Sequence, residues 1–303
     1  MRRVVSAVAA LAITVAAVLA LAFAFASGLG ACEGDEDSPP PAATVTVTET
    51  ASPTASSPSD SRGGGMTVSV YLMRGEHLGV SHRTVPSSAA VATAAMNALL
   101  AGPNARERAA GLGTAIPAGT TLNGVVVEGG TARVDLSGEF AAGGGSLSMQ
   151  ARVAQVVYTL TQFRTVRRVD FLIDGGRVET LGGEGIMLHA GQRRSDWNDL
   201  LPAIFVETPA VGDTVRSPLT VAGTAMVFEA TFVTEVLDEE GEILAQETVT
   251  ASRGAPQRGR FSVEIGFLTH GARRGALLVY EVSMADGSRL NQVRIPLRFA
   301  VGQ

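Results

Sequence analysis

The sequence predicts an α+β domain of two helices on a mainly antiparallel sheet, followed by an all-β sandwich. Three observations predict this arrangement. Between residues 66 and 185, apolar residues recur twice at helical spacing and several times at the alternating spacing of strands. From residue 203 onward only the alternating pattern is found, and turn-forming residues divide it. Ahead of both regions, residues 1–31 carry the features of an export signal.

The composition excludes several kinds of chemistry. All 24 basic residues of the 303-residue chain are arginine, so phosphate-binding loops and Schiff bases that need lysine are excluded. The single cysteine excludes an intramolecular disulfide and any zinc site with two thiolates. The net charge of −5 argues against a basic face for nucleic acid, so we expect no nucleic-acid partner.

The N-terminus predicts the compartment. Arg2 and Arg3 precede an uncharged apolar run over residues 4–26, as in a secretory signal. An uncleaved membrane anchor and cleavage after Ala26 are alternatives. Residues 29–32 (LGAC) resemble the lipobox of bacterial lipoproteins, where cleavage precedes a cysteine that carries diacylglycerol. This resemblance favours a lipoprotein signal over residues 1–31. It implies lipid attachment at Cys32 and a position on the extracytoplasmic side of the cell membrane.

Residues 32–65 are predicted to form a tether. An acidic cluster over residues 33–37 precedes three prolines at 39–41 and a stretch rich in Ser, Thr and Pro. Such a composition buries too little apolar surface to offset the conformational entropy that folding removes. We therefore expect a spacer between the membrane and the folded domains.

The first elements of the α+β domain follow from local patterns. Alternation over residues 67–72 predicts a half-buried strand with Tyr71 on its polar side. Ser87 or Ser88 is expected to cap a helix that ends at Gly102-Pro103. His77 and His82 are expected in a solvent-facing hairpin.

The second half of this domain is predicted in the same way. Strands over residues 122–128 and 132–136 are joined by a Gly129-Gly130 turn. Three glycines at 143–145 open a second helix, and residues 169–173 form a strand that ends at 174–176. The apolar face of that helix is expected to comprise Met149, Val153, Val156, Val157, Leu160 and Phe163.

Four stretches of residues 66–185 resemble the GerMN domain of sporulation and germination proteins. They are residues 100–103 (LAGP), 116–120 (IPAGT), 132–137 (ARVDLS) and 155–161 (QVVYTLT). The resemblance implies the fold. It implies no catalytic residues and no cofactor, because the family has no established catalytic constellation.

Residues 186–202 are predicted to connect the α+β domain to the sandwich, which spans residues 203–303. The connector is too polar for a core helix, and its Trp197 is expected to pack on a neighbouring domain. Residues 261–267 and 293–299 alternate as strands, with Pro296 on the polar side near a sheet edge. Turn signals at 240–241, 258–259 and 286–287 suggest about seven short strands.

Five stretches of this region resemble the immunoglobulin-like domain of bacterial spore germination proteins. They are residues 208–209, 217–218, 221–225, 228–230 and 259–261. The resemblance implies an immunoglobulin-like sandwich. Such domains accompany GerMN domains in some chains.

Few residues are candidates for catalysis or metal binding. Asp135 and Glu139 could act as an acid and base pair, although a strand face and a loop are the favoured positions for them. No metal-ligand or dinucleotide pattern is present in the sequence, so we expect no metal and no cofactor.

Three groups of residues are candidate partner contacts. Arg164, Arg167 and Arg168 could contact a phosphate-bearing wall polymer or lipid headgroups, although a solvated helix end is favoured. Trp197 is the second candidate. Glu229 either closes a structural hydrogen bond, which we favour, or marks a binding surface.

The sequence thus favours a non-enzymatic envelope lipoprotein. We expect it to bind a membrane partner protein or a wall polymer as a scaffold or regulator. A wall-acting hydrolase that uses carboxylates is the alternative from another class. A sporulation or germination role rests on the family resemblance, and the all-arginine basic set suggests a high-GC genome rather than a typical endospore former.

Overall fold

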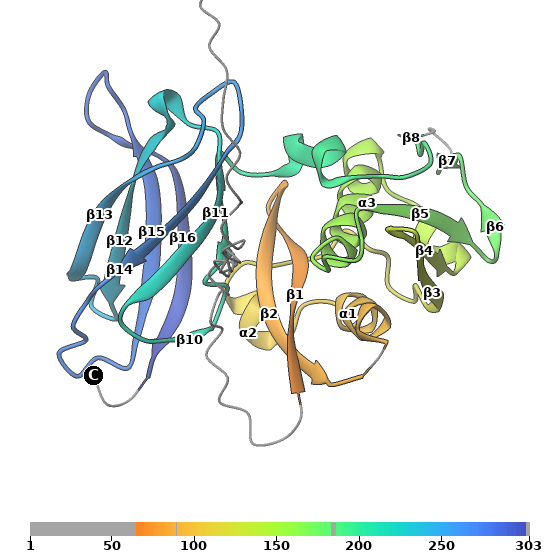
Figure 1. Cartoon of the computed structure of the whole chain (residues 1–303), viewed down its shortest axis with the longest axis horizontal. Helices are drawn as coiled ribbons and strands as arrows, with labels where there is room; N and C mark the ends of the chain where they lie inside the picture. The colour runs from red at the N-terminus through yellow and green to blue at the C-terminus, as the bar shows by residue number, and fades with distance from the viewer. Residues whose placement is uncertain (1–64, 89, 183–185, 301–303) are drawn as a thin grey trace, which may run out of the picture. The chain divides into compact units, whose positions relative to one another are not determined.

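The computed structural model describes residues 65–88, 90–182 and 186–300 (Figure 1). The predicted signal over residues 1–31, the acylation point Cys32 and the tether up to residue 64 lie outside the described residues. The described residues belong to one compact unit, which lies within Ser59–Gln303. Among the residues that the structure describes, no helix is both long and apolar enough to cross a membrane.

An antiparallel hairpin opens the first domain. Its strands β1 (Gly65–Arg74) and β2 (His77–Pro86) pair along their whole length. The side chain of Tyr71, on the polar side of the predicted half-buried strand, is only 2% exposed, so the strand is buried on both sides at this residue. The hairpin has helices on one side and the β-sandwich on the other, which leaves no solvent face at Tyr71 (Figure 1).

Two helices, α1 (Val91–Leu100) and α3 (Ser146–Leu160), pack against each other and against β1. As predicted, α1 ends before Gly102, which takes a positive φ of 68° ahead of Pro103. The predicted serine cap is wrong. No side chain caps α1, because the Ser88 hydroxyl accepts a hydrogen bond from the Ala90 N–H, outside the helix.

The second predicted helix is confirmed, but α3 is buried on both faces. It contacts the hairpin on one face and the second sheet on the other. The polar residues of α3 therefore need internal partners. Gln155 donates to the carbonyl of Tyr71 at 3.0 Å and accepts from the N–H of Ala115 at 2.8 Å. Arg152 donates to backbone carbonyls of the loop that precedes α3.

A four-stranded sheet covers the other face of α3. In order it contains β3 (Leu122–Glu128), β4 (Thr131–Leu136), β5 (Arg168–Ile173) and β6 (Gly176–Arg177). The predicted turn is confirmed, because Gly129 and Gly130 take φ values of 57° and 82°, as a type I′ turn requires. Only β4 and β5 are parallel in this sheet, and α3 lies in the crossover between them.

Several short elements complete the first domain and the connector. They are α2 (Ala105–Ala109), the 3-10 helices η1 (Gly138–Ala141) and η2 (Arg194–Leu200), and the paired strands β7 (Thr180–Leu181) and β8 (Ile186–Met187). A capping box between Asn104 and Glu107 begins α2. Burial raises the pKa of the Glu107 carboxyl, but hydrogen bonds from Arg83, Ser81 and Asn104 outweigh it and hold the pKa below its usual value.

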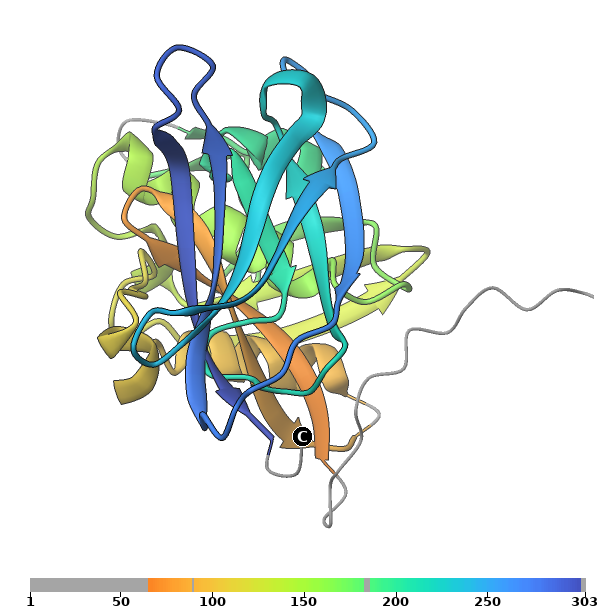
Figure 2. The ribbon, with the colours of Figure 1, turned by 90° about the vertical axis from the view of Figure 1, so that its left-hand side faces the viewer.

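The second domain is a β-sandwich of two sheets (Figure 2). The order of strands is β10-β16-β15-β12-β13 in the larger sheet and β14-β11-β9 in the smaller one. The strands are β9 (Ile204–Thr208), β10 (Thr214–Val215), β11 (Leu219–Ala225), β12 (Thr231–Asp238), β13 (Ile243–Thr250), β14 (Gly259–Ile265), β15 (Arg274–Val282) and β16 (Arg289–Phe299). The 3-10 turn η3 (Phe228–Ala230) joins β11 to β12.

The structure shows why glycine and proline occur at two positions of the sandwich. The pairing of β11 with β9 shifts register at Gly223, where a Cβ atom would lie 2.0 Å from the carbonyl oxygen of Phe205. Only glycine allows this close approach of the two strands. Pro296 of β16 is exposed, and β16 is separated from the sheet edge only by the two-residue strand β10, as predicted.

One hydrophobic core runs through both domains. The same cluster of buried side chains contains Tyr71 and Tyr158 of the first domain and Ile204, Phe205 and Ile295 of the second. The unit Ser59–Gln303 holds this whole core. We therefore expect this unit to fold on its own.

Candidate functional site

The two domains meet where the β1–β2 hairpin contacts β9, the loop after β9, and β16. The N–H of Val211 in that loop donates to the carbonyl of Val80 in β2 at 3.4 Å. His82 pairs with Asp213 through Nδ1 and Oδ2 at 2.8 Å. The prediction that His82 lies on a solvent-facing hairpin is therefore wrong, whereas His77 at the start of β2 is exposed.

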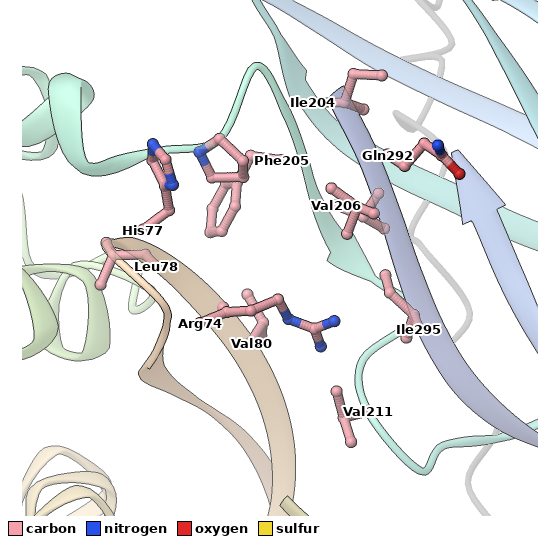
Figure 3. Close-up of a pocket in the computed structure, with 13 residues that line it drawn as sticks. Arg74, His77, Leu78, Val80, Ile204, Phe205, Val206, Val211, Gln292 and Ile295 are labelled. Carbon is pink, nitrogen blue, oxygen red and sulfur yellow. The ribbon is translucent and has the colours of Figure 1, made fainter. Parts of the chain in front are cut away.

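The interface contains a cavity near the turn of the hairpin. Its volume is about 190 Å³, and it lies between the hairpin, β9 and β16 (Figure 3). Its wall is mostly apolar and includes Phe205, Val206 and Ile295. The Arg74 side chain extends into this space from the end of β1 (Figure 3).

The charge of Arg74 has no carboxylate partner among the described residues. Its guanidinium donates one hydrogen bond, to the carbonyl of Arg294 at 2.7 Å. Burial lowers the pKa of the Arg74 guanidinium. A half-buried cation therefore borders an apolar cavity without a neutralising anion.

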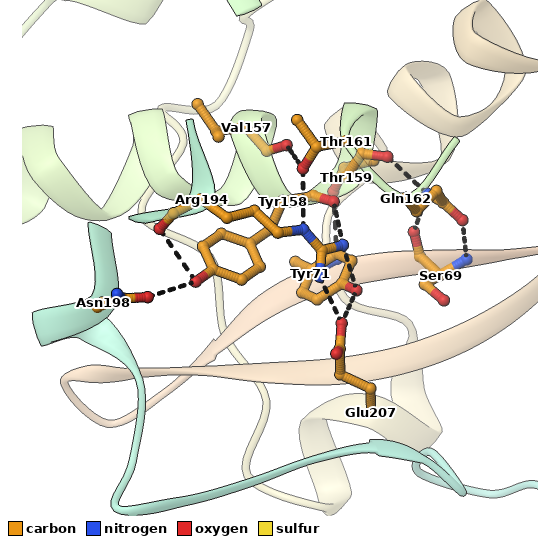
Figure 4. Close-up of polar contacts among 10 residues, drawn as sticks. All are labelled: Ser69, Tyr71, Val157, Tyr158, Thr159, Thr161, Gln162, Arg194, Asn198 and Glu207. Atoms are coloured by element: carbon orange, nitrogen blue, oxygen red, sulfur yellow. Dashed lines mark hydrogen bonds and ion pairs between the residues drawn. The ribbon is translucent and has the colours of Figure 1, made fainter. Parts of the chain in front are cut away.

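A polar cluster fills another part of the same interface (Figure 4). The connector supplies Arg194, which donates to the Glu207 carboxylate of β9 at 2.7 Å and to the Tyr71 hydroxyl at 2.8 Å. That hydroxyl donates in turn to Glu207 at 2.5 Å. β1, the connector and β9 thus share one hydrogen-bond network, in which Tyr71 is 123 residues from Arg194.

Aromatic rings enclose the Arg194 guanidinium. Its Cζ atom lies 5.0 Å from the ring centroid of Tyr71 and 4.7 Å from that of Tyr158, which is cation–π geometry. Phe205 packs edge-on against Tyr158, with the ring centroids 6.1 Å apart. Arg194 also donates to the Thr161 hydroxyl at 2.9 Å at the end of α3.

The cluster is not arranged to supply a reactive phenolate. Burial raises the pKa of the Tyr71 hydroxyl well above its usual value, and burial raises the pKa of Tyr158 to about 12. Both hydroxyls therefore stay protonated near neutral pH, where they act as hydrogen-bonding groups. The geometry indicates a structural role for the cluster.

A second candidate surface lies at one end of the sandwich. We define the loop-tip patch as the exposed apolar residues Met226, Phe228, Val282, Met284 and Leu290. Phe228 is 61% exposed and Met284 82% exposed. Glu281 joins the two loops, because its carboxylate accepts from the N–H of Phe228 at 2.9 Å and from the Asn291 side chain at 2.8 Å. Figure 2 shows both loops at the same end of the sandwich.

Comparison with protein families assigns both domains. Residues 69–179 match the family described as sporulation and spore germination. Residues 203–288 match the family described as the immunoglobulin-like domain of bacterial spore germination. This chain is a GerMN-domain protein of the sporulation and germination type. A comparison with curated proteins gave no match.

Solved structures with a GerMN domain are similar to this chain. The tandem GerMN domains of the sporulation protein GerM from Bacillus subtilis are 20% identical, with 67% of this chain covered and a TM-score of 0.38. The chain spans 61% of the length of that protein. The first GerMN domain of GerM alone is 27% identical, with 43% of this chain and 99% of that one covered and a TM-score of 0.35.

A third structure is that of a candidate lipoprotein from Clostridium perfringens. It is 21% identical, with a TM-score of 0.33, and the match covers 46% of this chain and 93% of that one.

The predicted arginine cluster lies on the GerMN domain. Arg164 and Arg167 are exposed, and Arg168 is half-buried at the start of β5. Arg164 lies beyond the C-terminal end of α3, and no carboxylate of the described chain pairs with any of the three. None of the three side chains lines the cavity.

The other two predicted contacts differ in exposure. Trp197 is buried in η2, which contacts α3, so little of its surface is free for a partner. Glu229 is exposed beside Phe228 in η3, where it takes a positive φ of 52°. No described group bonds its carboxylate, so the favoured structural hydrogen bond does not form.

The predicted acid and base pair is not assembled as a catalytic site. Asp135 lies half-buried on β4 and accepts from the N–H of Gly175 at 3.0 Å. Glu139 is exposed in η1, and a hydrogen bond from Ser137 is the main cause that holds the pKa of its carboxyl below the usual value. In the described residues, no group of three or more His, Cys, Asp or Glu side chains could hold a metal ion.

Proposed function

We propose that this GerMN-domain protein is a non-enzymatic lipoprotein of the cell envelope that binds a partner protein outside the membrane. The observation that carries the proposal is the loop-tip patch on the immunoglobulin-like domain. Exposed apolar side chains gathered on two linked loops are typical of interaction surfaces on soluble domains. Phe228 and Met284 would otherwise remain in water at a cost that a partner can remove.

The surroundings of the patch favour a protein partner with basic residues. Glu229 and Asp286 are exposed acids in the same two loops, and no arginine ion pair neutralises either of them in the described chain. An apolar surface beside these two acids is complementary to a protein surface that is apolar and carries basic residues.

The position of the patch fits a protein held by its N-terminus. β1 begins at Gly65 near one end of the described structure, and the patch lies near the other (Figures 1 and 2). Acylation at Cys32 would hold the chain through the tether that precedes Gly65. The patch would then be presented to partners away from the point of attachment.

Partner binding can be tested by photo-crosslinking in cells. A photoreactive amino acid is placed at Phe228 or Met284, and at Val126, an exposed valine on β3, as the control. We expect a discrete protein adduct from the two patch positions that is absent from the control position. Adducts of the same yield from all three positions would contradict the proposal, and an adduct with polysaccharide would replace the protein partner with a wall polymer.

Membrane attachment is tested separately. Metabolic labelling with a radioactive fatty acid should label the wild-type chain and leave the Cys32→Ala variant unlabelled. Label retained in that variant would exclude acylation at Cys32, and a wild-type chain that is membrane-bound but unlabelled would favour the uncleaved anchor.

The hydrolase alternative has its own test. A general acid of a wall hydrolase needs a raised pKa, whereas that of Glu139 is lowered. We expect no soluble fragments when the unit Ser59–Gln303 is incubated with peptidoglycan. Fragments that disappear with Asp135→Ala would establish the hydrolase instead. A role confined to sporulation or germination is a narrower form of our proposal, and a phenotype of the deletion strain in growing cells would argue against it.

A further inference from the structure

The cavity at the domain interface has the size of a small organic ligand. An apolar protein cavity of about 150 Å³ is large enough to bind benzene. The cavity here measures about 190 Å³ and is therefore large enough for a six-membered ring with one additional polar group. It is too small for a peptide, a sugar chain or a lipid tail.

The wall of the cavity selects an apolar ligand body. Phe205 and Val206 come from β9, Val80 comes from β2, and Val293 and Ile295 come from β16. These side chains offer no hydrogen bonds, so a ligand with several hydroxyl groups would lose its contacts with water without compensation.

The positive charge of Arg74 in the cavity lining favours an anionic ligand. Arg74 is the residue with a permanent charge among those that line it, and its one hydrogen bond goes to the carbonyl of Arg294. Its guanidinium carries five N–H donors in a planar fork that fits a carboxylate. His77 and Gln292 lie on the same lining and can add donors for the ligand head.

From this combination we propose that the cavity binds a small monocarboxylate with a compact apolar body, with the carboxylate on Arg74 and the body between β9 and β16. The ligand contacts the hairpin of the GerMN domain and two strands of the sandwich at once. Its binding therefore stabilises the two domains in their present arrangement, because a ligand favours the state to which it binds.

Benzoate is a suitable probe, with benzamide as its neutral control of the same shape. The ¹⁵N-labelled unit Ser59–Gln303 is titrated with each, and amide shifts are followed by NMR. We expect benzoate to shift the amides of residues 77–80, 204–206 and 292–295. Benzamide should bind at least about tenfold more weakly, which is the effect of one charge-assisted hydrogen-bonded pair.

Three variants locate the site. Arg74→Gln should weaken benzoate binding by about tenfold or more and leave benzamide binding nearly unchanged. Val293→Phe fills the cavity while Arg74 is retained, and it should abolish binding of both compounds. Arg216→Gln removes an exposed arginine that lies outside the cavity lining, and it should change nothing.

The titration of the wild-type unit alone can overturn the proposal, whatever the stability of the variants. Equal affinity for benzoate and benzamide would contradict recognition by Arg74. Absence of shifts at the three cavity segments would contradict a ligand site in this cavity. Unchanged benzoate binding by a folded Val293→Phe protein would place binding elsewhere and overturn the assignment.

Discussion

Arg194 and Arg74 lie at the same domain interface but in opposite electrostatic situations. Arg194 has a carboxylate at 2.7 Å, a tyrosine hydroxyl at 2.8 Å and two aromatic rings around it. Arg74 has one backbone carbonyl and borders a cavity. Arg194 comes from the connector, and Arg74 comes from the end of β1.

The number of bonded partners distinguishes an arginine that stabilises the interface from one that can bind a ligand. A cation whose donors are occupied by the protein itself stabilises the interface and has little left to offer a ligand. A cation whose charge is uncompensated stabilises the interface little and keeps donors free for an anion. The same residue type therefore serves two purposes at one interface, and matched substitutions can distinguish them.

The largest effect is expected for Arg194→Met. Loss of the guanidinium leaves the Glu207 carboxylate and the Tyr71 hydroxyl without their charged partner. Because the side chains of Arg194 and Glu207 are 30% and 29% exposed, the cost is smaller than for a fully buried ion pair. We expect the free energy of unfolding to fall by about 2–3 kcal/mol in urea titrations. A change below about 0.5 kcal/mol would show that the cluster does not stabilise the interface.

The second-largest effect is expected at alkaline pH, where ionisation of Tyr158 should destabilise the cluster around Arg194. Burial raises the pKa of Tyr158 to about 12 in the folded chain, above the usual value of about 10 in the unfolded chain. The contribution of Tyr158 to the free energy of unfolding is fully present below about pH 10 and is lost as the pH rises toward 12. Over this range the free energy of unfolding should fall by about 1.4 kcal/mol per pH unit because of this residue.

The pH dependence is measured by urea titration at several pH values between 9 and about 12. Tyr158→Phe is the control, because it removes the titrating hydroxyl and keeps the ring against Phe205. The same slope in wild type and Tyr158→Phe would contradict the assignment.

The smallest effect is expected for Arg74→Met, the same substitution on the other side of the comparison. Because no carboxylate loses a partner, the free energy of unfolding should change by less than about 1 kcal/mol. The measurement is the urea titration used for Arg194→Met. A loss as large as that of Arg194→Met would mean that Arg74 is a structural residue, and the distinction between the two sites would disappear.

Local chemistry explains which parts of the fold could be predicted. The Gly129-Gly130 turn and the end of α1 at Gly102 depend on backbone conformations that glycine adopts readily, so neighbouring residues suffice to predict them. The periodicity of residues 149–163 likewise predicts α3, although the helix ends at Leu160, before Phe163.

Long-range packing explains what the sequence did not reveal. The alternating pattern places Tyr71 on the polar side of the strand, and its partners Arg194 and Glu207 do not enter that pattern because they are 123 and 136 residues away in sequence. The same reason applies to the burial of Gln155, whose partner at Tyr71 is 84 residues away. Periodicity records whether one face is apolar, and it cannot show that a polar face finds partners in another domain.

In the candidate site too, local patterns in the sequence indicate some residues, and others depend on long-range packing. Glu229 was singled out because an acid stands beside an aromatic residue, and the structure places both on the exposed loop tips. Neither Arg74 nor Arg194 was singled out. No local motif distinguishes them from the other arginines, and their difference arises only when the two domains are packed together.

The two domains share one core and one interface, and differential scanning calorimetry of the unit Ser59–Gln303 tests this most directly. We predict a single transition for the wild type, with equal calorimetric and van't Hoff enthalpies. Arg194→Met should lower its temperature and divide it into two. Two separate transitions in the wild type, with neither moved by Arg194→Met, would contradict the claim.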